Sequence, residues 1–138
     1  MSMKRVILVA LCMVCIGAHA QTERVEGIGG FFFRAQDPKA LSAWYAKHLG
    51  IDPVPQSYEQ KPWTQQAGYT VFAPFPADTK YFAQGWMINF RVRDLDAMAA
   101  QLRSAGIDVA LDKTEYPNGR FARLQDPEGN PIQLWQPR

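Results

Sequence analysis

The sequence has few cysteines and histidines, and both cysteines lie near its start. Cys12 and Cys15 fall within the first twenty residues, so the rest of the chain has no thiol for a disulfide or for a thiolate metal site. Of the two histidines, only His48 follows these residues. After residue 20 the chain must therefore be stabilised by its hydrophobic core, and it offers a single imidazole as a metal ligand.

The sequence also lacks an apolar run long enough to span a membrane. The longest run, Val6–Gly17, is shorter than the ~20 apolar residues that cross a bilayer. It follows Lys4 and Arg5 and precedes Ala18–Ala20, a small-x-small motif that is typical of signal-peptidase cleavage. We therefore expect residues 1–20 to be a signal peptide and the protein to be exported, either to the periplasm or out of the cell. The alternative is a membrane anchor.

No charge of one sign accumulates in the remaining chain. Removal of residues 1–20 would leave equal numbers of acidic and basic side chains, without a basic run. This balance argues against nucleic acid as a partner and against an anionic membrane surface after cleavage. Residues 21–138 are enough for one compact domain, so we expect a single domain with a small molecule as its partner and no cofactor.

Two parts of the chain repeat the same order of signals. In the first, Asp37 precedes Pro38 and a helical pattern that ends at Gly50. In the second, Asp94 precedes a helical pattern that ends at Gly106. Short stretches that precede and follow both helices are expected to be strands, so the chain consists of two copies of one unit. These stretches are 31–33, 69–72, 87–90, 107–111, 120–125 and 132–135.

These paired units, the WYAKHLG sequence at 44–50 and the DPEGNPIQLW sequence at 126–135 resemble the vicinal oxygen chelate superfamily. This superfamily includes glyoxalase I, bleomycin resistance proteins and extradiol dioxygenases. The resemblance implies an α+β fold of two βαβββ modules, at about 27–80 and 86–137, whose curled mixed sheets surround a shared cavity with the helices outside. Because many members form dimers, it also implies a homodimer. The turn residues at 126–130 independently predict a hairpin.

Enzymes of this superfamily hold a divalent metal through His, Glu or Gln at fixed distances from these motifs. The matching positions here hold Gly30, Met87 and Gln133, and a fourth ligand would fall near Thr70 or Val71. Glycine has no side-chain donor, a thioether suits copper(I), and an amide is a weak neutral ligand, whereas a catalytic zinc site needs about three good donors. We therefore expect no metal at these positions.

Strand alternation indicates what the cavity would offer instead. Met87, Asn89 and Arg91 share one face of their strand, and Gln133 and Trp135 share one face of the last strand. We expect Met87, Asn89, Gln133 and Trp135 to bind a neutral or weakly polar organic molecule through stacking and a few hydrogen bonds. The alternative is that these side chains fill the cavity and satisfy one another.

Two functions remain open from the sequence. The first is a metal-free protein that binds a small organic ligand, as bleomycin resistance proteins do. The second is a glyoxalase-, lyase-, isomerase- or dioxygenase-type enzyme with a non-standard or recruited metal site. Glu115 and Arg120 are its weak catalytic candidates, as a base and an electrophilic partner, although they also fit a solvated loop. His48 is expected to make a helix-end or core contact rather than to bind metal.

Overall fold

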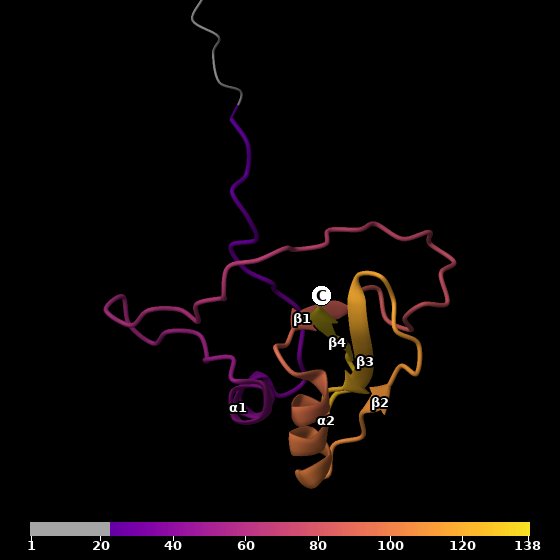
Figure 1. Ribbon diagram of the computed structural model, residues 1–138. Coiled ribbons are helices and arrows are strands. Elements are labelled where there is room, and N and C mark those ends of the chain that lie inside the picture. The colour runs from indigo at the N-terminus through magenta and orange to yellow at the C-terminus, as the bar shows by residue number, and fades with distance from the viewer. Residues whose placement is uncertain (1–22) are drawn as a thin grey trace, which may run out of the picture. The chain divides into compact units, whose positions relative to one another are not determined.

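The computed structural model describes residues 23–138 (Figure 1). Residues 23–32 belong to one unit and residues 33–138 to another, and every described helix and strand lies in the second unit. No helix within the described range is both long and apolar enough to cross a membrane. The expected signal peptide, residues 1–20, lies outside the described residues.

The first helix, α1, spans Pro38–Leu49 and has the boundaries that its sequence predicts. The Asp37 carboxylate accepts a 3.0 Å hydrogen bond from the Ala40 backbone N–H, which satisfies one of the unpaired donors of the first turn. Gly50 follows the helix with φ 67°, a left-handed conformation that glycine adopts without a steric penalty. The predicted N-cap and the predicted stop are both confirmed.

The second helix, α2, spans Leu95–Ser104 and repeats this design. The Asp94 carboxylate accepts a 2.9 Å hydrogen bond from the Ala97 N–H. Gly106 follows the helix with φ 79°. The second helix predicted from the repeat is therefore present, with its N-cap at the expected residue.

The strands form one unclosed, mixed sheet in the order β1-β4-β3-β2. They are β1 (Ile88–Arg91), β2 (Ala110–Leu111), β3 (Gly119–Gln125) and β4 (Pro131–Pro137). β1 runs parallel to β4, and the other neighbouring pairs are antiparallel. Because α2 lies between β1 and β2 in the chain, this half forms the βαβββ unit that the resemblance implies, and the α+β fold class is confirmed.

The strands predicted for the first half are not present in the structure. Neither 31–33 nor 69–72 forms a strand, and this part of the sequence analysis was wrong. A strand needs a neighbour to pair its N–H and C=O groups, and the 51–76 segment contains five prolines, each without an N–H. Phe33 packs against aromatic rings instead, with its centroid 5.0 Å from that of Trp86 and 6.3 Å from that of Tyr45.

The core lies between one face of the sheet and the helices. Ile132 and Leu134 of β4 are fully buried together with Leu95 and Leu102 of α2. Each buried side chain of this size contributes about 1.5–3 kcal/mol of transfer free energy. α1 adds Tyr45 to the same cluster. Because the core occupies this face, the alternate residues of β1, β3 and β4 are directed to the opposite face, where the predicted site residues lie.

The β3–β4 turn ties the hairpin to the start of α1. Gly129 donates a 2.9 Å backbone hydrogen bond to Asp126 and has φ 81°, so the predicted hairpin and its glycine are confirmed. The Glu128 carboxylate accepts hydrogen bonds from the backbone N–H groups of Gln36 (2.9 Å) and Asp37 (2.9 Å). The DPEGN motif therefore positions the first helix as well as turning the chain.

Candidate functional site

Polar side chains line the sheet face that lies opposite the core. The register places Asn89 of β1 beside Gln133 of β4, and Gln133 beside Arg123 of β3. In the next row, Trp135 lies between Arg91 and Phe121. The structure therefore brings Asn89, Gln133 and Trp135 onto one face, as strand alternation indicates.

A chain of side-chain hydrogen bonds runs across this face. The Asn89 Nδ2 donates to Gln133 Oε1 (2.8 Å), and the Gln133 Nε2 donates to the Tyr81 hydroxyl (2.9 Å). Gln133 is 6% exposed, so its amide is fixed by these partners, whereas Asn89 and Tyr81 are exposed. The Tyr81 hydroxyl accepts in this chain and keeps its own proton to donate to a ligand.

Arg123 lies against the same tyrosine. Its guanidinium carbon is 4.0 Å from the centroid of the Tyr81 ring, and its Nη1 donates to the Tyr81 backbone oxygen. A cation–π contact of this kind contributes about 0.5–1 kcal/mol at an exposed site. Tyr81 is therefore held both through its ring and through its hydroxyl. We call the group of Tyr81, Asn89, Phe121, Arg123 and Gln133 the amide site.

Aromatic rings form the neighbouring part of this face. The rings of Phe121 and Trp135 are stacked, with centroids 6.2 Å apart and planes 7° apart, and Tyr116 meets Phe121 edge to face at 5.7 Å. The Trp135 indole N–H donates to the Asn118 backbone oxygen (2.9 Å), and this side chain is 8% exposed. Trp135 thus packs beside Phe121 on the neighbouring strand, and Phe121 is the ring that is half-exposed for stacking.

A hollow of about 470 Å³ lies beside the amide site and is bordered by four of its five members, since Asn89 does not line it. The predicted site residue Trp135 does not line it either. The hollow is lined by Tyr81, Tyr116, Phe121, Arg123 and Gln133, together with Asn118 and residues of the β2 region. This volume falls within the range of small-molecule sites in proteins. The lining combines aromatic faces, a buried amide and a cation, which is what a site for one oriented organic molecule requires.

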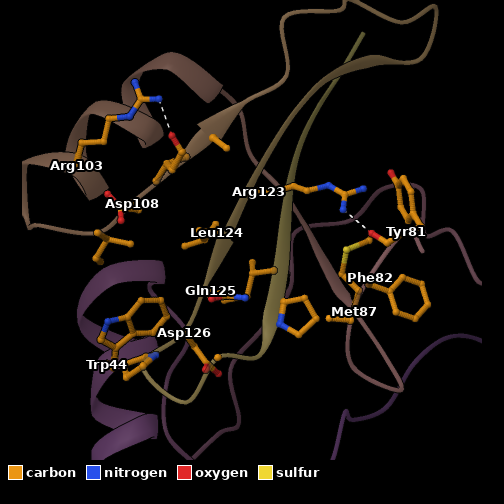
Figure 2. Close-up of a pocket in the computed structure, with 18 of the residues that line it drawn as sticks. Trp44, Tyr81, Phe82, Met87, Arg103, Asp108, Arg123, Leu124, Gln125 and Asp126 are labelled. Atoms are coloured by element: carbon orange, nitrogen blue, oxygen red, sulfur yellow. Dashed lines mark hydrogen bonds between the residues drawn. The ribbon is translucent and has the colours of Figure 1, made fainter. Parts of the chain in front are cut away.

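A larger hollow of about 950 Å³ surrounds the β2-side edge of β3 (Figure 2). Tyr81 and Arg123 line both hollows and so form the boundary between them. Met87, which the sequence assigns to the ligand pocket, lines the larger hollow and not the smaller one. On the far side of the larger hollow, Arg103 donates to the Val109 backbone oxygen (2.6 Å).

The positions that correspond to metal ligands offer few donors. Gln133 is occupied by its two hydrogen bonds, and Thr70 and Val71 are exposed in irregular chain. The His48 ring packs 5.4 Å from that of Trp44 near the end of α1, in the helix-end setting that we expected. Within residues 23–138, no three His, Cys, Asp or Glu side chains lie close enough together to hold a metal ion.

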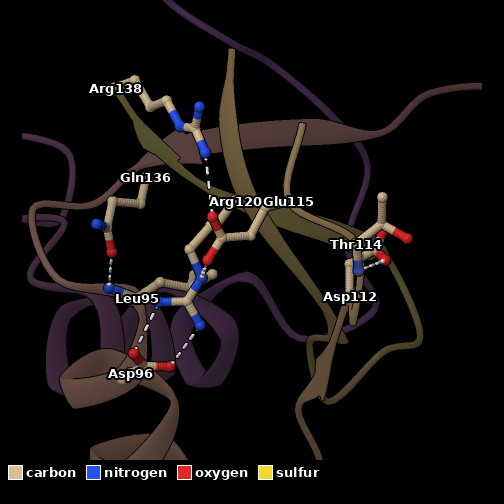
Figure 3. A network of polar contacts seen from close by, with 8 residues as sticks. All are labelled: Leu95, Asp96, Asp112, Thr114, Glu115, Arg120, Gln136 and Arg138. Atoms are coloured by element: carbon tan, nitrogen blue, oxygen red, sulfur yellow. Dashed lines mark hydrogen bonds and ion pairs between the residues drawn. The ribbon is translucent and has the colours of Figure 1, made fainter. Parts of the chain in front are cut away.

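Arg120 shares the core-facing side of β3 with Ala122 and Leu124, opposite the amide site, and Figure 3 shows it beside Glu115. Arg120 binds both carboxylate oxygens of Asp96 on α2, at 2.7 and 2.8 Å. This hydrogen bonding lowers the pKa of Asp96 below its usual value. Glu115 is 3.9 Å from Arg120 and 3.0 Å from Arg138. The structure does not bring these two candidates to Gln133; they join α2, β3 and the C-terminus.

Sequence reasoning missed Arg123 and Phe121. Both belong to FARL, in which they alternate with the buried residues Ala122 and Leu124. The same alternation argument that placed Gln133 and Trp135 on one face could have found them. The contact of Tyr81 with Gln133 had no comparable signal, because Tyr81 lies in an irregular segment that reaches Gln133 through tertiary structure alone.

A family model described as a glyoxalase-like domain matches residues 30–135. Among solved structures, the antibiotic-binding protein TnmS3 from Streptomyces sp. CB03234 is 26% identical, with a TM-score of 0.57, over 85% of this chain and 100% of that one. Lactoylglutathione lyase from Agrobacterium tumefaciens is 17% identical, with a TM-score of 0.55, over 83% of this chain and 96% of that one, which shows similarity of fold alone.

A shorter match has higher identity. A glyoxalase/bleomycin resistance protein from Streptomyces sp. CB03234 is 36% identical over 38% of this chain, with a TM-score of 0.34. That match spans 46% of the other protein, which is less than half of its length. No curated protein matches the chain.

Proposed function

Because the chain belongs to the glyoxalase-like domain family, we propose that it is a metal-independent member of this family that binds a small organic molecule at the amide site. The observation that carries the proposal is the hydrogen-bonded chain from Asn89 through Gln133 to Tyr81 beside the 470 Å³ hollow. A buried amide with both of its groups paired is a fixed platform, and the Tyr81 hydroxyl at its end can donate to a ligand.

The aromatic part of the face supplies the area for binding. The half-exposed ring of Phe121 is parallel to that of Trp135 on the neighbouring strand, and Tyr116 contacts it edge to face. A planar ligand that covers Phe121 would remove apolar surface from water at about 25 cal/mol per Å². The polar side chains would orient a ligand through hydrogen bonds, and the aromatic rings would supply contact area. Small-molecule sites in proteins combine these two features. The antibiotic-binding function of TnmS3, a relative over its full length, supports this class of ligand.

The side chains at the family's metal positions support a metal-independent function. A glycine, a thioether and a hydrogen-bonded amide stand where a glyoxalase-type enzyme needs several oxygen or imidazole ligands. Gln133 could turn toward a metal only by giving up its bonds to Asn89 and Tyr81. The lyase alternative rests on a likeness of fold to a protein that is 17% identical, so binding is the better-supported function.

We also propose that the protein acts outside the cytoplasm. The basic start, the short apolar run and the small residues before Gln21 support cleavage after Ala20. A homodimer is part of the same proposal and is supported by the resemblance to the superfamily. Light scattering of the purified protein would distinguish a dimer of the cleaved chain from a monomer.

The binding proposal is tested with a panel of small aromatic compounds in thermal-shift assays that contain EDTA. A compound at a hundred times its Kd should raise the free energy of unfolding by about 2.7 kcal/mol, a shift of several degrees. The stabilisation should be lost in Gln133→Leu and kept in Gln101→Leu, the same change at an exposed position of α2. Stabilisation that persists unchanged in Gln133→Leu, or that requires an added metal, would contradict the proposal.

A further inference from the structure

We infer that the amide site selects a planar aromatic anion that carries a carboxylate, rather than a neutral ligand. This inference rests on the proposed function, because it concerns the same site and adds the chemical class of its ligand. Two arginines on the ligand-facing side of the sheet, Arg91 and Arg123, carry it, and neither forms an ion pair with a carboxylate of residues 23–138. The sequence alone predicted a neutral or weakly polar ligand because Arg123 had not been placed on this face.

The two arginines lie on the two strands that flank β4. Arg123 on β3 is adjacent to Gln133 in the register, and Arg91 on β1 is adjacent to Trp135 two residues further along β4. β1 and β3 are separated by β4 alone, so their backbones are about 10 Å apart, two strand spacings. A bicyclic aromatic acid that covers Phe121 would lie within reach of Arg123, which lines the 470 Å³ hollow. Arg91 does not line this hollow and would contribute only through its charge.

Both guanidinium groups are held in place by neutral oxygens. Arg91 donates to the backbone oxygens of Ala67 (3.1 Å) and Gln66 (2.6 Å), and Arg123 donates to the backbone oxygen of Tyr81. A carbonyl oxygen fixes an arginine but does not neutralise it, and each group keeps further N–H donors. The ion pairs within residues 23–138 join Arg120 and Arg138 to acids on the opposite side, so the charges of Arg91 and Arg123 remain available.

The hollow also contains the carboxylate of Asp112, which is hydrogen-bonded to other groups. This carboxylate accepts hydrogen bonds from the Thr114 N–H (2.9 Å) and from the Tyr116 hydroxyl (3.1 Å). The backbone hydrogen bond from Thr114 is the main cause of its lowered pKa, and the charge of Arg123 adds to the effect. Asp112 therefore offsets part of the positive potential without occupying Arg123. The face retains a net positive charge around a neutral amide and aromatic rings.

A matched pair of probes tests the charge directly. 2-Naphthoate and 2-naphthamide have the same ring system and differ in whether the head group is an anion or a neutral amide. We expect the full chain to bind 2-naphthoate about tenfold more tightly than 2-naphthamide, because charge-assisted hydrogen bonds from arginine are roughly twice as strong as neutral ones. The preference should shrink at 1 M salt, where the Debye length is about 3 Å.

Variants locate the source of the preference. Arg123→Gln should remove most of it, Arg91→Gln should reduce it, and Arg34→Gln, which removes an exposed arginine ahead of α1, should leave it unchanged. Because Arg123 also holds Tyr81, both Kd values are measured in Arg123→Gln, and 2-naphthoate should lose more affinity than 2-naphthamide. If Arg123→Gln does not fold, Arg123→Lys, which keeps the charge and loses the planar fork, should retain part of the preference.

The outcomes separate the inference from the proposed function. Equal Kd values for the two probes, both weakened in Gln133→Leu, would overturn the anion inference and leave the binding function standing. A preference for 2-naphthoate that survives Arg91→Gln and Arg123→Gln would also overturn the inference. Binding of either probe that Gln133→Leu does not change would contradict the proposed site, and a failure of both probes to bind would overturn the ligand class.

Discussion

The Tyr45 hydroxyl on α1 donates a 2.9 Å hydrogen bond to Oδ2 of Asp126, at the end of β3. Both residues are buried, at 8% and 5% exposure, so the bond joins a helix of the first half of the chain to the hairpin of the second. Asp126 also accepts from the Glu128 N–H (2.9 Å) and from the backbone and side-chain N–H groups of Asn130 (3.0 and 2.7 Å). The hairpin that carries Gln133 is therefore positioned partly by α1.

Tyr45→Phe should lower the free energy of unfolding by about 2 kcal/mol, because it removes a hydrogen bond to a charged, buried carboxylate. Urea denaturation followed by tryptophan fluorescence measures the change. Tyr58→Phe, at an exposed position, is the control and should have no measurable effect. A Tyr45→Phe variant as stable as the wild type would mean that Asp126 is fully satisfied by the turn alone.

The same tyrosine predicts a loss of stability at high pH. Burial, followed by the hydrogen bond to Asp126, raises the pKa of Tyr45 above its usual value near 10. The folded protein therefore favours the protonated phenol. The contribution of Tyr45 to the free energy of unfolding is fully present below pH 10, and it is lost as the pH rises above the pKa of this tyrosine in the unfolded chain. Unfolding free energies measured between pH 9 and 11 should fall more steeply for the wild type than for Tyr45→Phe; parallel curves would contradict the assignment.

Gly119→Ala should destabilise the protein by more than about 1 kcal/mol and disturb the support of the amide site. Gly119 begins β3 with φ 131°, and an added Cβ would clash with the Gln136 backbone oxygen and come within 2.8 Å of the Trp135 indole nitrogen. Melting temperature and tryptophan emission report the two effects. Gly85→Ala, where an added Cβ would meet nothing within 4 Å, should change neither, and equal behaviour of the two variants would contradict the prediction.

Divalent metals should not stabilise the purified protein. A metal that binds the folded protein and is present at a free concentration of a hundred times its Kd would raise the free energy of unfolding by about 2.7 kcal/mol. We expect no shift in melting temperature with zinc, nickel, manganese or iron(II), and none with EDTA, because Met87 and Gln133 are poor ligands for these ions. A stabilisation that disappears in Gln133→Ala would show that the amide site holds a metal, and would favour the enzyme alternative.

N-terminal sequencing tests the proposed export. Protein recovered from the cell envelope or the medium should begin at Gln21, since Ala18 and Ala20 form the small-x-small motif. Recovery of chains that keep Met1 in the membrane fraction would indicate the anchor alternative.

Local signals predicted the structure better than long-range ones. The N-caps at Asp37 and Asp94 and the turn at 126–130 depend on a few neighbouring residues, and all three were predicted. A strand depends on a partner elsewhere in the chain, which explains why 31–33 was assigned wrongly from its apolar residues. The face shared by Asn89 and Gln133 followed from alternation within strands that the family resemblance placed around a shared cavity.

In the candidate site, too, residues in regular strands could be predicted better than residues in irregular segments. Gln133 and Asn89 could be predicted because each lies in a regular strand, where alternation decides the face. The hydrogen bond between Gln133 and Tyr81 could not be predicted, since an irregular segment positions Tyr81 and no periodicity indicates its partner. Met87 was expected at the amide site but lines the larger hollow, because it precedes β1 and has no register with β4.

The most direct measurement is an NMR titration of the uniformly 15N-labelled protein with 2-naphthoate in buffer that contains EDTA. If the probe binds at the amide site, the side-chain NH₂ resonances of Asn89 and Gln133 should shift as its concentration rises, together with the backbone signals of Phe121 and Arg123. The variants Asn89→Asp and Gln133→Leu assign the two side-chain resonances. The side-chain resonance of Gln101, which lies on α2, should stay in place. Shifts confined to residues outside the amide site, or shifts that appear only when a divalent metal replaces the EDTA, would contradict the proposed function.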